Sequence, residues 1–249
     1  MRTPLMAGNW KMYKTAGETT AFFEKFNPLV ANSAHCGIAI CPTFVNIPAA
    51  VAAAAGSRVG IGGQNLYWAK EGAFTGEISA PMLKAVGCEY VIIGHSERRQ
   101  FFGETDATVL KKTVAALEAG LKPIVCVGEL LADREAGKTE DVLVSQFTNG
   151  IAGLSDMQFA QIVIAYEPVW AIGTGKVATP DMAADAHRTI RAQVEKKYRT
   201  PAAQAVRILY GGSVKPDNVK GLMAQPEIDG ALVGGASLDA VSFACIVNF

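Results

Sequence analysis

Short apolar runs alternate with longer amphipathic segments along the whole chain. Eight of these short runs lack the strict polar alternation of half-exposed strands, which indicates parallel strands covered on the outside by helices. We expect these strands at residues 5–11, 37–41, 59–63, 90–93, 122–127, 161–166, 206–210 and 230–233.

The segments between the apolar runs predict one helix after each strand. These helices are expected at residues 18–30, 48–55, 81–86, 106–119, 141–151, 180–198, 216–223 and 238–247. The sixth has the clearest beginning, because Thr179 is a suitable N-cap and Pro180 suits the first helical position. Its apolar stripe at i, i+4 spacing consists of Met182, Ala186, Ile190 and Val194.

Eight strand–helix pairs in 249 residues, without a linker rich in Pro, Gly or Ser, match a (β/α)8 barrel. We therefore expect a single catalytic domain over residues 1–249. A doubly wound open sheet is the alternative, but no G-x-G-x-x-G sequence follows the first strand. The Gly-Thr-Gly at 173–175 follows the sixth strand and is not a dinucleotide-binding loop.

Composition narrows the class of protein. Lys plus Arg equals Asp plus Glu at 23 each, so no overall field favours nucleic acid or an anionic membrane. The five cysteines are scattered without a C-x-x-C pair, which argues against a disulfide framework and a zinc site. The sequence has no signal-peptide h-region and no apolar run near the ~18 residues of a membrane span. We expect a soluble, cytoplasmic protein with no metal and no nucleic-acid or membrane partner.

The segment from 162 to 176 carries the first candidate for chemistry. An apolar run ends in a carboxylate, Glu167, and Pro168 stops the strand directly after it. Val169, Trp170 and a Gly-Thr-Gly sequence follow, which is the pattern of a catalytic base with a lid. The alternative is an ordinary surface loop in which Glu167 is a solvated turn residue.

Other polar and glycine residues also follow strands. They are Asn9 and Lys11, His95, Gly211-Gly212-Ser213, and Gly234-Gly235. In a barrel these loops meet at one face, which would bring the residues together. Taken singly, Lys11 could be a solvated cation, His95 a structural histidine and the glycine pairs tight turns. His35 and His187 are interpreted as surface or structural residues.

Together these residues predict a cofactor-free isomerisation. Glycine-rich backbone after the last two strands, with Lys11 beside it, suits a phosphate group. A carboxylate base with a histidine donor suits removal of a proton next to a carbonyl. No metal cluster or nucleotide motif is evident. A class I aldolase would need a lysine inside a strand, for which Lys122 is a poor candidate, and a non-catalytic sugar-phosphate binder would not need Glu167 and His95.

Six blocks of the sequence resemble the triosephosphate isomerase family. They are residues 9–12 (NWKM), 64–65 (QN) with 72–77 (GAFTGE), 94–99 (GHSERR), 165–176 (AYEPVWAIGTGK), 210–214 (YGGSV) and 232–237 (LVGGAS). The blocks follow the family's order and cover almost the whole chain. The resemblance implies a TIM barrel that interconverts dihydroxyacetone phosphate and D-glyceraldehyde 3-phosphate through an enediolate, without a cofactor, in glycolysis and gluconeogenesis.

The resemblance also implies roles for single residues. Glu167 would be the base, His95 the electrophile, and Asn9 and Lys11 the groups that orient substrate and balance charge, with Glu97 as the acidic neighbour of that lysine. Substrate-binding residues would include Asn9, Lys11, Ser96, Gly173, Ser213, Gly234 and Gly235. The lid would consist of Pro168, Val169, Trp170, Ala171, Ile172, Gly173, Thr174, Gly175 and Lys176. Gln64, Asn65 and Thr75 would lie in a homodimer interface formed by the third βα loop, where each subunit completes its neighbour's site.

Overall fold

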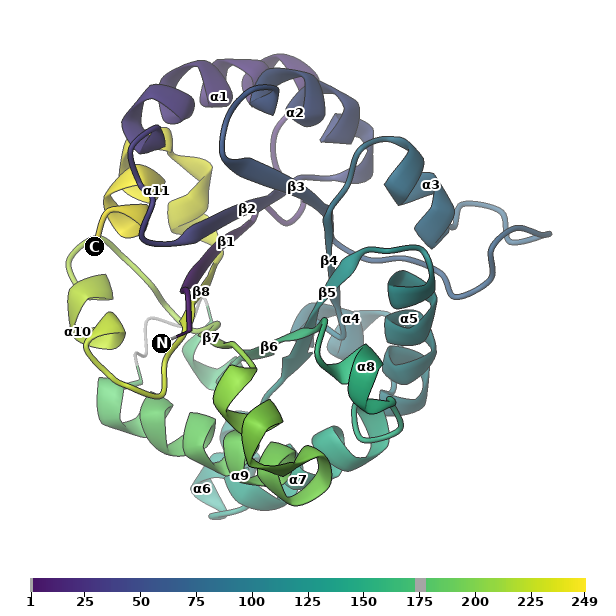
Figure 1. Ribbon diagram of the computed structural model, residues 1–249, viewed down its shortest axis with the longest axis vertical. Coiled ribbons are helices and arrows are strands. Elements are labelled where there is room, and N and C mark those ends of the chain that lie inside the picture. Colours follow the sequence, from purple (N-terminus) through teal and green to yellow (C-terminus); the bar gives the residue numbers. More distant parts are fainter. Residues whose placement is uncertain (1, 173–177) are drawn as a thin grey trace.

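The computed structural model describes residues 2–172 and 178–249, and its centre is a closed barrel of parallel strands (Figure 1). Each strand pairs with the next along the chain, and the last pairs with the first. The strands are β1 (Leu5–Asn9), β2 (Gly37–Cys41), β3 (Val59–Gly63), β4 (Tyr90–Ile93), β5 (Lys122–Val127), β6 (Val163–Tyr166), β7 (Ile208–Tyr210) and β8 (Gly230–Val233). The predicted (β/α)8 barrel is confirmed.

Helices surround the barrel on the outside (Figure 1). The main helices after successive strands are α1 (Ala16–Val30), α2 (Ile47–Ala54), α3 (Ala80–Ala85), α5 (Asp106–Glu118), α7 (Thr139–Gly150), α9 (Pro180–Ala205), α10 (Val219–Met223) and α11 (Ala240–Val247). Additional short helices are α4 (Ser96–Phe101), α6 (Leu131–Glu135) and α8 (Asp156–Phe159), with 3₁₀ turns η1 (Phe44–Asn46), η2 (Val169–Ala171) and η3 (Gly235–Leu238). Among the described helices, none is long and apolar enough to cross a membrane.

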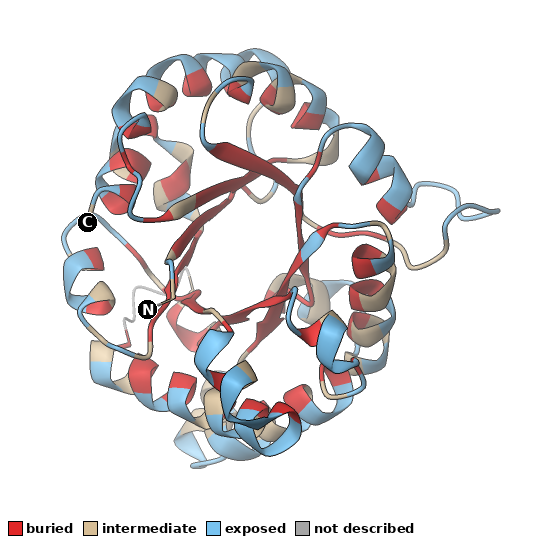
Figure 2. Cartoon of the chain, in the orientation of Figure 1, coloured by how far each residue is buried: buried red, intermediate tan, exposed pale blue. Residues whose placement is uncertain are grey.

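Almost every strand residue is buried, which explains why the strands lack polar alternation (Figure 2). One face of the strands packs against the helices in a large outer core, and the other face fills the barrel. Cys41 and Cys126 lie in this inner core as fully buried thiols, where each packs as a small apolar side chain.

Helix α9 begins as the sequence predicts. The Thr179 hydroxyl accepts a hydrogen bond from the Met182 N–H at 3.2 Å, and Pro180 occupies the first helical position. The first helical stretch ends at the predicted residue 198, because Arg199 has a φ of 74°, and a further stretch runs on to Ala205. A residue in the left-handed region interrupts a helix, so the segment after Arg199 is a separate short helix joined across a kink.

Several predicted boundaries are wrong by a few residues. Strand β1 ends at Asn9 because Lys11 has a φ of 52°, which an extended strand cannot adopt. Helix α10 starts at Val219 because the Asn218 side chain accepts a hydrogen bond from the Lys215 N–H at 2.8 Å and closes a turn first. Strands β6 and β7 start two residues late, and η3 precedes α11.

Candidate active site

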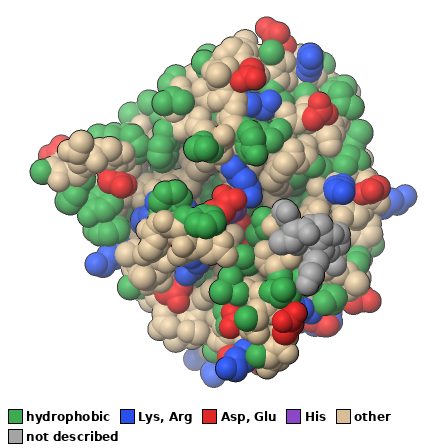
Figure 3. Space-filling view, turned by 180° about the vertical axis from the view of Figure 1, so that it is seen from behind, with side chains coloured by type: hydrophobic (Ala, Val, Ile, Leu, Met, Phe, Trp, Pro, Cys, Tyr) green, Lys and Arg blue, Asp and Glu red, His purple; other side chains and the backbone are tan. Residues whose placement is uncertain are grey.

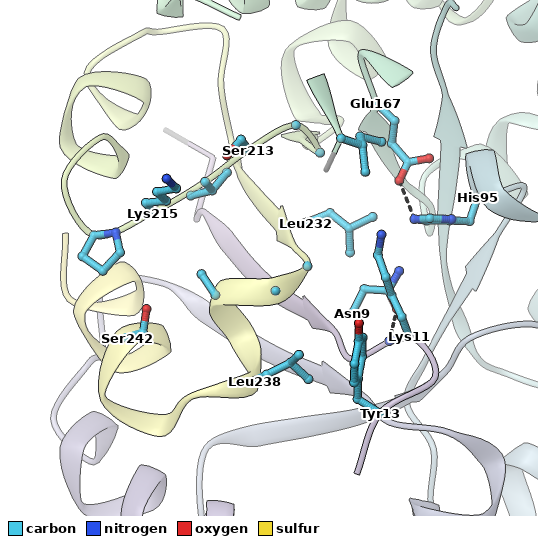
Figure 4. Close-up of a pocket in the computed structure, with 18 of the residues that line it drawn as sticks. Asn9, Lys11, Tyr13, His95, Glu167, Ser213, Lys215, Leu232, Leu238 and Ser242 are labelled. Carbon is cyan, nitrogen blue, oxygen red and sulfur yellow. Dashed lines mark hydrogen bonds and ion pairs between the residues drawn. The ribbon is translucent and has the colours of Figure 1, made fainter. Parts of the chain in front are cut away.

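A cavity of about 690 Å³ opens at the carboxyl ends of the strands (Figure 4). The predicted site residues that line it are Asn9, Lys11, His95, Glu167, Ile172 of the predicted lid, Ser213, Gly234 and Gly235. They come from five different strand ends, as a barrel site requires. Gly173, Thr174, Gly175 and Lys176 lie outside the described residues.

Other predicted residues surround this cavity. Ser96 lines a neighbouring cavity behind the Glu167 carboxylate. Gln64, Asn65 and Glu97 line a third cavity of about 260 Å³, which shares Asn9, Lys11 and His95 with the main one. Thr75 is exposed in the protruding segment between β3 and α3 and lines neither of the two cavities that contain His95.

Glu167 directly follows β6 and is only 2% exposed, so the alternative of a solvated turn residue is wrong. Its Oε1 lies 2.9 Å from His95 Nε2, and its Oε2 accepts a hydrogen bond from the Ser96 N–H at 3.0 Å. Burial opposes ionisation, but His95, the Ser96 N–H and Lys11 outweigh it and hold the pKa of Glu167 below its usual value. The carboxylate is therefore charged and turned toward His95.

His95 is the N-cap residue of α4 and is 5% exposed. Its Nδ1 accepts a hydrogen bond from the Glu97 N–H at 3.2 Å, so the proton of the neutral ring lies on Nε2, facing Glu167. Burial disfavours the imidazolium form, but the Glu167 carboxylate outweighs burial and raises the pKa of His95 in this arrangement. The protonation of His95 is thus tied to the position of one carboxylate.

Lys11 is fixed from both its backbone and its side chain. Its N–H donates to Asn9 Oδ1 at 3.0 Å, and its carbonyl accepts from Gln64 Nε2 at 2.8 Å. Its Nζ lies 2.6 Å from Glu97 Oε1. A lysine with positive φ costs on the order of 1 kcal/mol and persists only where its surroundings hold it. These contacts maintain a positive charge at the edge of the cavity.

The loops after β7 and β8 form the opposite wall from glycine-rich backbone. A Cβ atom on Gly212 would lie 2.2 Å from the Tyr210 hydroxyl oxygen, so only glycine fits there. Among the described residues, no hydrogen bond from the N–H groups of Gly212, Ser213 or Gly235 is found. Free N–H groups close to a lysine favour an anion, and phosphate is the anion that barrels bind after the last two strands.

Glu129 is a functional candidate that the sequence reasoning missed. It is fully buried in the loop between β5 and α6, and its Oε1 accepts hydrogen bonds from the Tyr166 hydroxyl at 3.1 Å and from Trp170 Nε1 at 2.8 Å. Arg134 Nη1 lies 3.4 Å from the same oxygen. Glu129 follows an apolar strand just as Glu167 does, so the same pattern could have identified it.

The structure also tests the alternatives. Lys122 lies at the amino end of β5, half-exposed and 3.5 Å from Glu89, far from the position of a Schiff-base lysine. His187 is fully buried and structural, with Nδ1 3.0 Å from the Glu227 carbonyl, whereas His35 is exposed and contacts the Val247 carbonyl. Among the described residues, no cluster of His, Cys, Asp and Glu could hold a metal ion.

Comparisons with known proteins agree with this geometry. The family model of triosephosphate isomerase matches residues 4–249. Triosephosphate isomerase from Solibacter usitatus is 72% identical over all 249 residues and the full length of both chains. The Moorella thermoacetica protein of the same name is 57% identical over 100% of this chain and 99% of its own. A crystal structure of triosephosphate isomerase from Bartonella henselae superposes with a TM-score of 0.89 at 38% identity, covering 99% and 98% of the two chains.

Proposed function

The chain belongs to the triosephosphate isomerase family, and from this premise we propose that Glu167 and His95 interconvert dihydroxyacetone phosphate and D-glyceraldehyde 3-phosphate. The observation that carries the proposal is the buried contact of 2.9 Å between these two side chains beside a glycine-rich anion site. The reaction moves a proton between two neighbouring carbons of the substrate, and it needs a base on the carbon and a donor at the oxygen.

The phosphate group binds first to the backbone of Ser213, Gly234 and Gly235, with Lys11 supplying positive charge. This remote binding energy positions the triose beside Glu167 and His95. Little rotational freedom of the substrate then has to be lost on reaching the transition state.

Glu167 becomes a stronger base when it turns from His95 and the Ser96 N–H toward the substrate carbon. Those two partners lower the pKa of the carboxylate in the resting arrangement, whereas burial alone would raise it. Leaving them removes the stabilisation of the charged form, so the carboxylate accepts the substrate proton more readily and then returns it to the adjacent carbon.

His95 acts as a neutral donor through Nε2–H. Once Glu167 has moved away, the main cause of its raised pKa is gone, and burial together with the Glu97 N–H at Nδ1 favours the neutral ring. The Nε2–H group can then donate to the substrate oxygen as negative charge develops on the enediolate.

We propose that the segment from Pro168 to Lys176 acts as the lid of this site, and residues 168–172 of it are described by the structure. Its first part, η2, is attached to buried Glu129 through Trp170, which gives the segment a fixed base. Closure would exclude water and prevent the enediolate from expelling phosphate, a side reaction that yields methylglyoxal. Deletion of residues 172–174 should lower turnover and raise the methylglyoxal fraction, with substrate binding partly retained. An unchanged methylglyoxal fraction would contradict the role of the lid.

A coupled assay that follows D-glyceraldehyde 3-phosphate without any added cofactor tests the activity. Phosphoglycolate should inhibit competitively, because it carries a phosphate dianion and a second anionic group in place of the enediolate. Phosphoglycolate should compete less well as pH falls below the second pKa of its phosphate monoester group, which is about 6. Equal turnover of glyceraldehyde and its phosphate would show that the anion site does not drive the reaction.

We also propose a homodimer formed through the segment between β3 and α3. This segment protrudes from the barrel (Figure 1), and hydrophobic side chains are visible on the protrusion in Figure 3. Exposed apolar side chains there and beside the third cavity are Met12 (90%), Phe74 (43%), Phe101 (72%) and Phe102 (67%). The third cavity borders Lys11 and His95, so a neighbour's loop inserted there would support the catalytic residues.

The dimer proposal is tested with Thr75→Arg, which adds a bulky charge to the exposed tip. Sedimentation should detect monomer, and activity measured on the same sample should be strongly impaired while circular dichroism stays close to that of the parent. A monomer with parental activity would show that the neighbour contributes nothing to the site. Thr20→Arg, an exposed position on α1, serves as the matched control.

We place the enzyme in the cytoplasm, in glycolysis and gluconeogenesis. All five cysteines are free, and four of them are buried, which suits a reducing compartment. Cell fractionation with the isomerase assay tests this, and activity found mainly outside the cytoplasmic fraction would contradict it.

A further inference from the structure

The cavity of about 690 Å³ is larger than a three-carbon phosphate monoester needs, and falls in the range that encloses drug-sized ligands. Its extra space lies between the loops after β7 and β8, beyond the glycine-rich wall (Figure 4). A Cβ atom built on Gly235 would meet nothing within 4 Å, so this space starts directly at the anion site. The outer groove, as we call it, is lined by Lys215, Pro216, Asp217, Leu238 and Ser242.

The outer groove combines apolar and polar side chains. Pro216 and Leu238 supply apolar surface, and Ser242 presents its hydroxyl toward the loop that carries Lys215 in Figure 4. Lys215 is exposed and forms no ion pair with the described residues, unlike Lys11, which is paired with Glu97. A free ammonium group beside an anion site favours a second negative charge at this end of the cavity.

The distance between the anion site at Ser213 and the ammonium group of Lys215 limits the size of the ligand. Lys215 is two residues beyond Ser213, so their Cα atoms are at most about 7 Å apart. The lysine side chain is flexible and extends the reach of its ammonium group beyond that separation. A spacer of a few carbon atoms can therefore connect a phosphate in the anion site with a group at Lys215. Asp217, also exposed in the groove, opposes a second anion and limits its affinity.

We propose that the outer groove binds the far phosphate of bisphosphates whose two phosphate groups are joined by a chain of about three to six carbon atoms. The phosphate would occupy the site of the substrate phosphate, so this inference rests on the proposed function. Such a ligand competes with the triose phosphate and makes the isomerase sensitive to metabolites that carry two phosphate groups.

The test compares inhibition constants of alkane diol bisphosphates, from propanediol to hexanediol, with those of alkyl monophosphates of matched length. One bisphosphate length should inhibit about fivefold more strongly than its matched monophosphate, the gain expected of an exposed ion pair. Lys215→Ala should reduce this preference to less than twofold, and Asp217→Asn should increase it. The preference should also fall with rising ionic strength, because exposed charges are screened.

Lys220→Ala is the matched control, since Lys220 is exposed on the nearby α10 but does not line the groove. It should leave the bisphosphate preference intact. Competition by phosphoglycolate is measured in parallel, and its absence would overturn the proposed function itself. If phosphoglycolate competes but bisphosphates of every length inhibit no better than monophosphates, or Lys215→Ala leaves the preference intact, the outer groove does not bind a second anion.

Discussion

His95 and His187 are both buried, but the first lies at the carboxyl end of the barrel and the second between α9 and the barrel wall. His95 faces a carboxylate at 2.9 Å, and its pKa is raised. His187 contacts the Glu227 carbonyl at 3.0 Å and the edge of the Tyr166 ring, and burial lowers its pKa to about 4. Two histidines of similar burial therefore differ in protonation. His187 stays neutral near pH 7, whereas His95 can be protonated beside its carboxylate partner.

This difference shows that burial alone does not identify a functional histidine. His187 Nε2 is buried without a hydrogen-bond partner among the described residues, which is tolerated because the ring stays neutral. In contrast, both nitrogens of His95 have partners, and one of these partners is a group that can move. A site for proton transfer thus needs a neighbour whose position changes the protonation of the ring.

The largest effect on catalysis is expected from replacing His95, the histidine at the carboxyl end of the barrel. His95→Gln replaces the imidazole with a flexible amide whose N–H groups are not fixed at the position of His95 Nε2, so we expect kcat/KM to fall on the order of 10²- to 10³-fold. The midpoint of urea unfolding should change little. Steady-state kinetics and unfolding of the same preparation check this, with His187→Gln as the matched variant, in which stability should fall and activity should be largely retained.

Lowering the pH should destabilise the folded protein through His187, the structural histidine of the pair. Because the pKa of His187 is about 4 in the folded state and about 6.5 in the unfolded state, the unfolded chain binds more protons between these values. Stability is therefore lost as pH falls from about 6.5 to 4, by about 3 kcal/mol from this residue. His187→Leu should be less stable at pH 7, having lost the bond to the Glu227 carbonyl, but its further loss on acidification should be smaller. Urea unfolding at both pH values measures the difference, and parallel pH profiles for parent and variant would be the contrary result.

Shortening the side chain of Glu167 tests whether its carboxylate controls the protonation of His95. Glu167→Asp retracts the carboxylate by one methylene, and such misplacements cost on the order of 10²-fold in rate. The retracted group should also lie farther from His95 Nε2, so the pKa of His95 measured by NMR should fall toward that of an isolated buried histidine. Activity within a factor of two of the parent would remove Glu167 from its role as base.

The barrel could be predicted from the sequence because parallel strands buried on both faces leave continuous apolar runs. Most of the site could also be predicted, because its residues directly follow the strands. It did not predict that Glu167 would turn toward His95, since that contact joins residues 72 positions apart and depends on closure of the barrel. Glu129 was missed although its place after the apolar strand β5 resembles that of Glu167, because its partners lie on β6 and η2 and only the fold brings them to it. The break at Arg199 agrees with the predicted end of the sixth helix at 198, and the Thr200-Pro201 sequence after it repeats the N-cap and first-position pattern of Thr179-Pro180, from which a second short helix could have been predicted.

The smallest effect is expected at Tyr166, which connects the two regions. Its ring packs edge-on against His187, its hydroxyl donates to Glu129 at 3.1 Å, and Glu167 is the next residue along the chain. Tyr166→Phe removes only the hydroxyl, and Glu129 Oε1 still accepts from Trp170 at 2.8 Å. Loss of one of several hydrogen bonds to a buried carboxylate should therefore lower the free energy of unfolding by about 1 kcal/mol. We expect kcat/KM to fall by less than about threefold. Urea unfolding and the coupled assay measure both quantities. A tenfold loss of activity without further destabilisation would show that the buried network around Glu129 controls the base, and that the two regions are coupled through this hydroxyl.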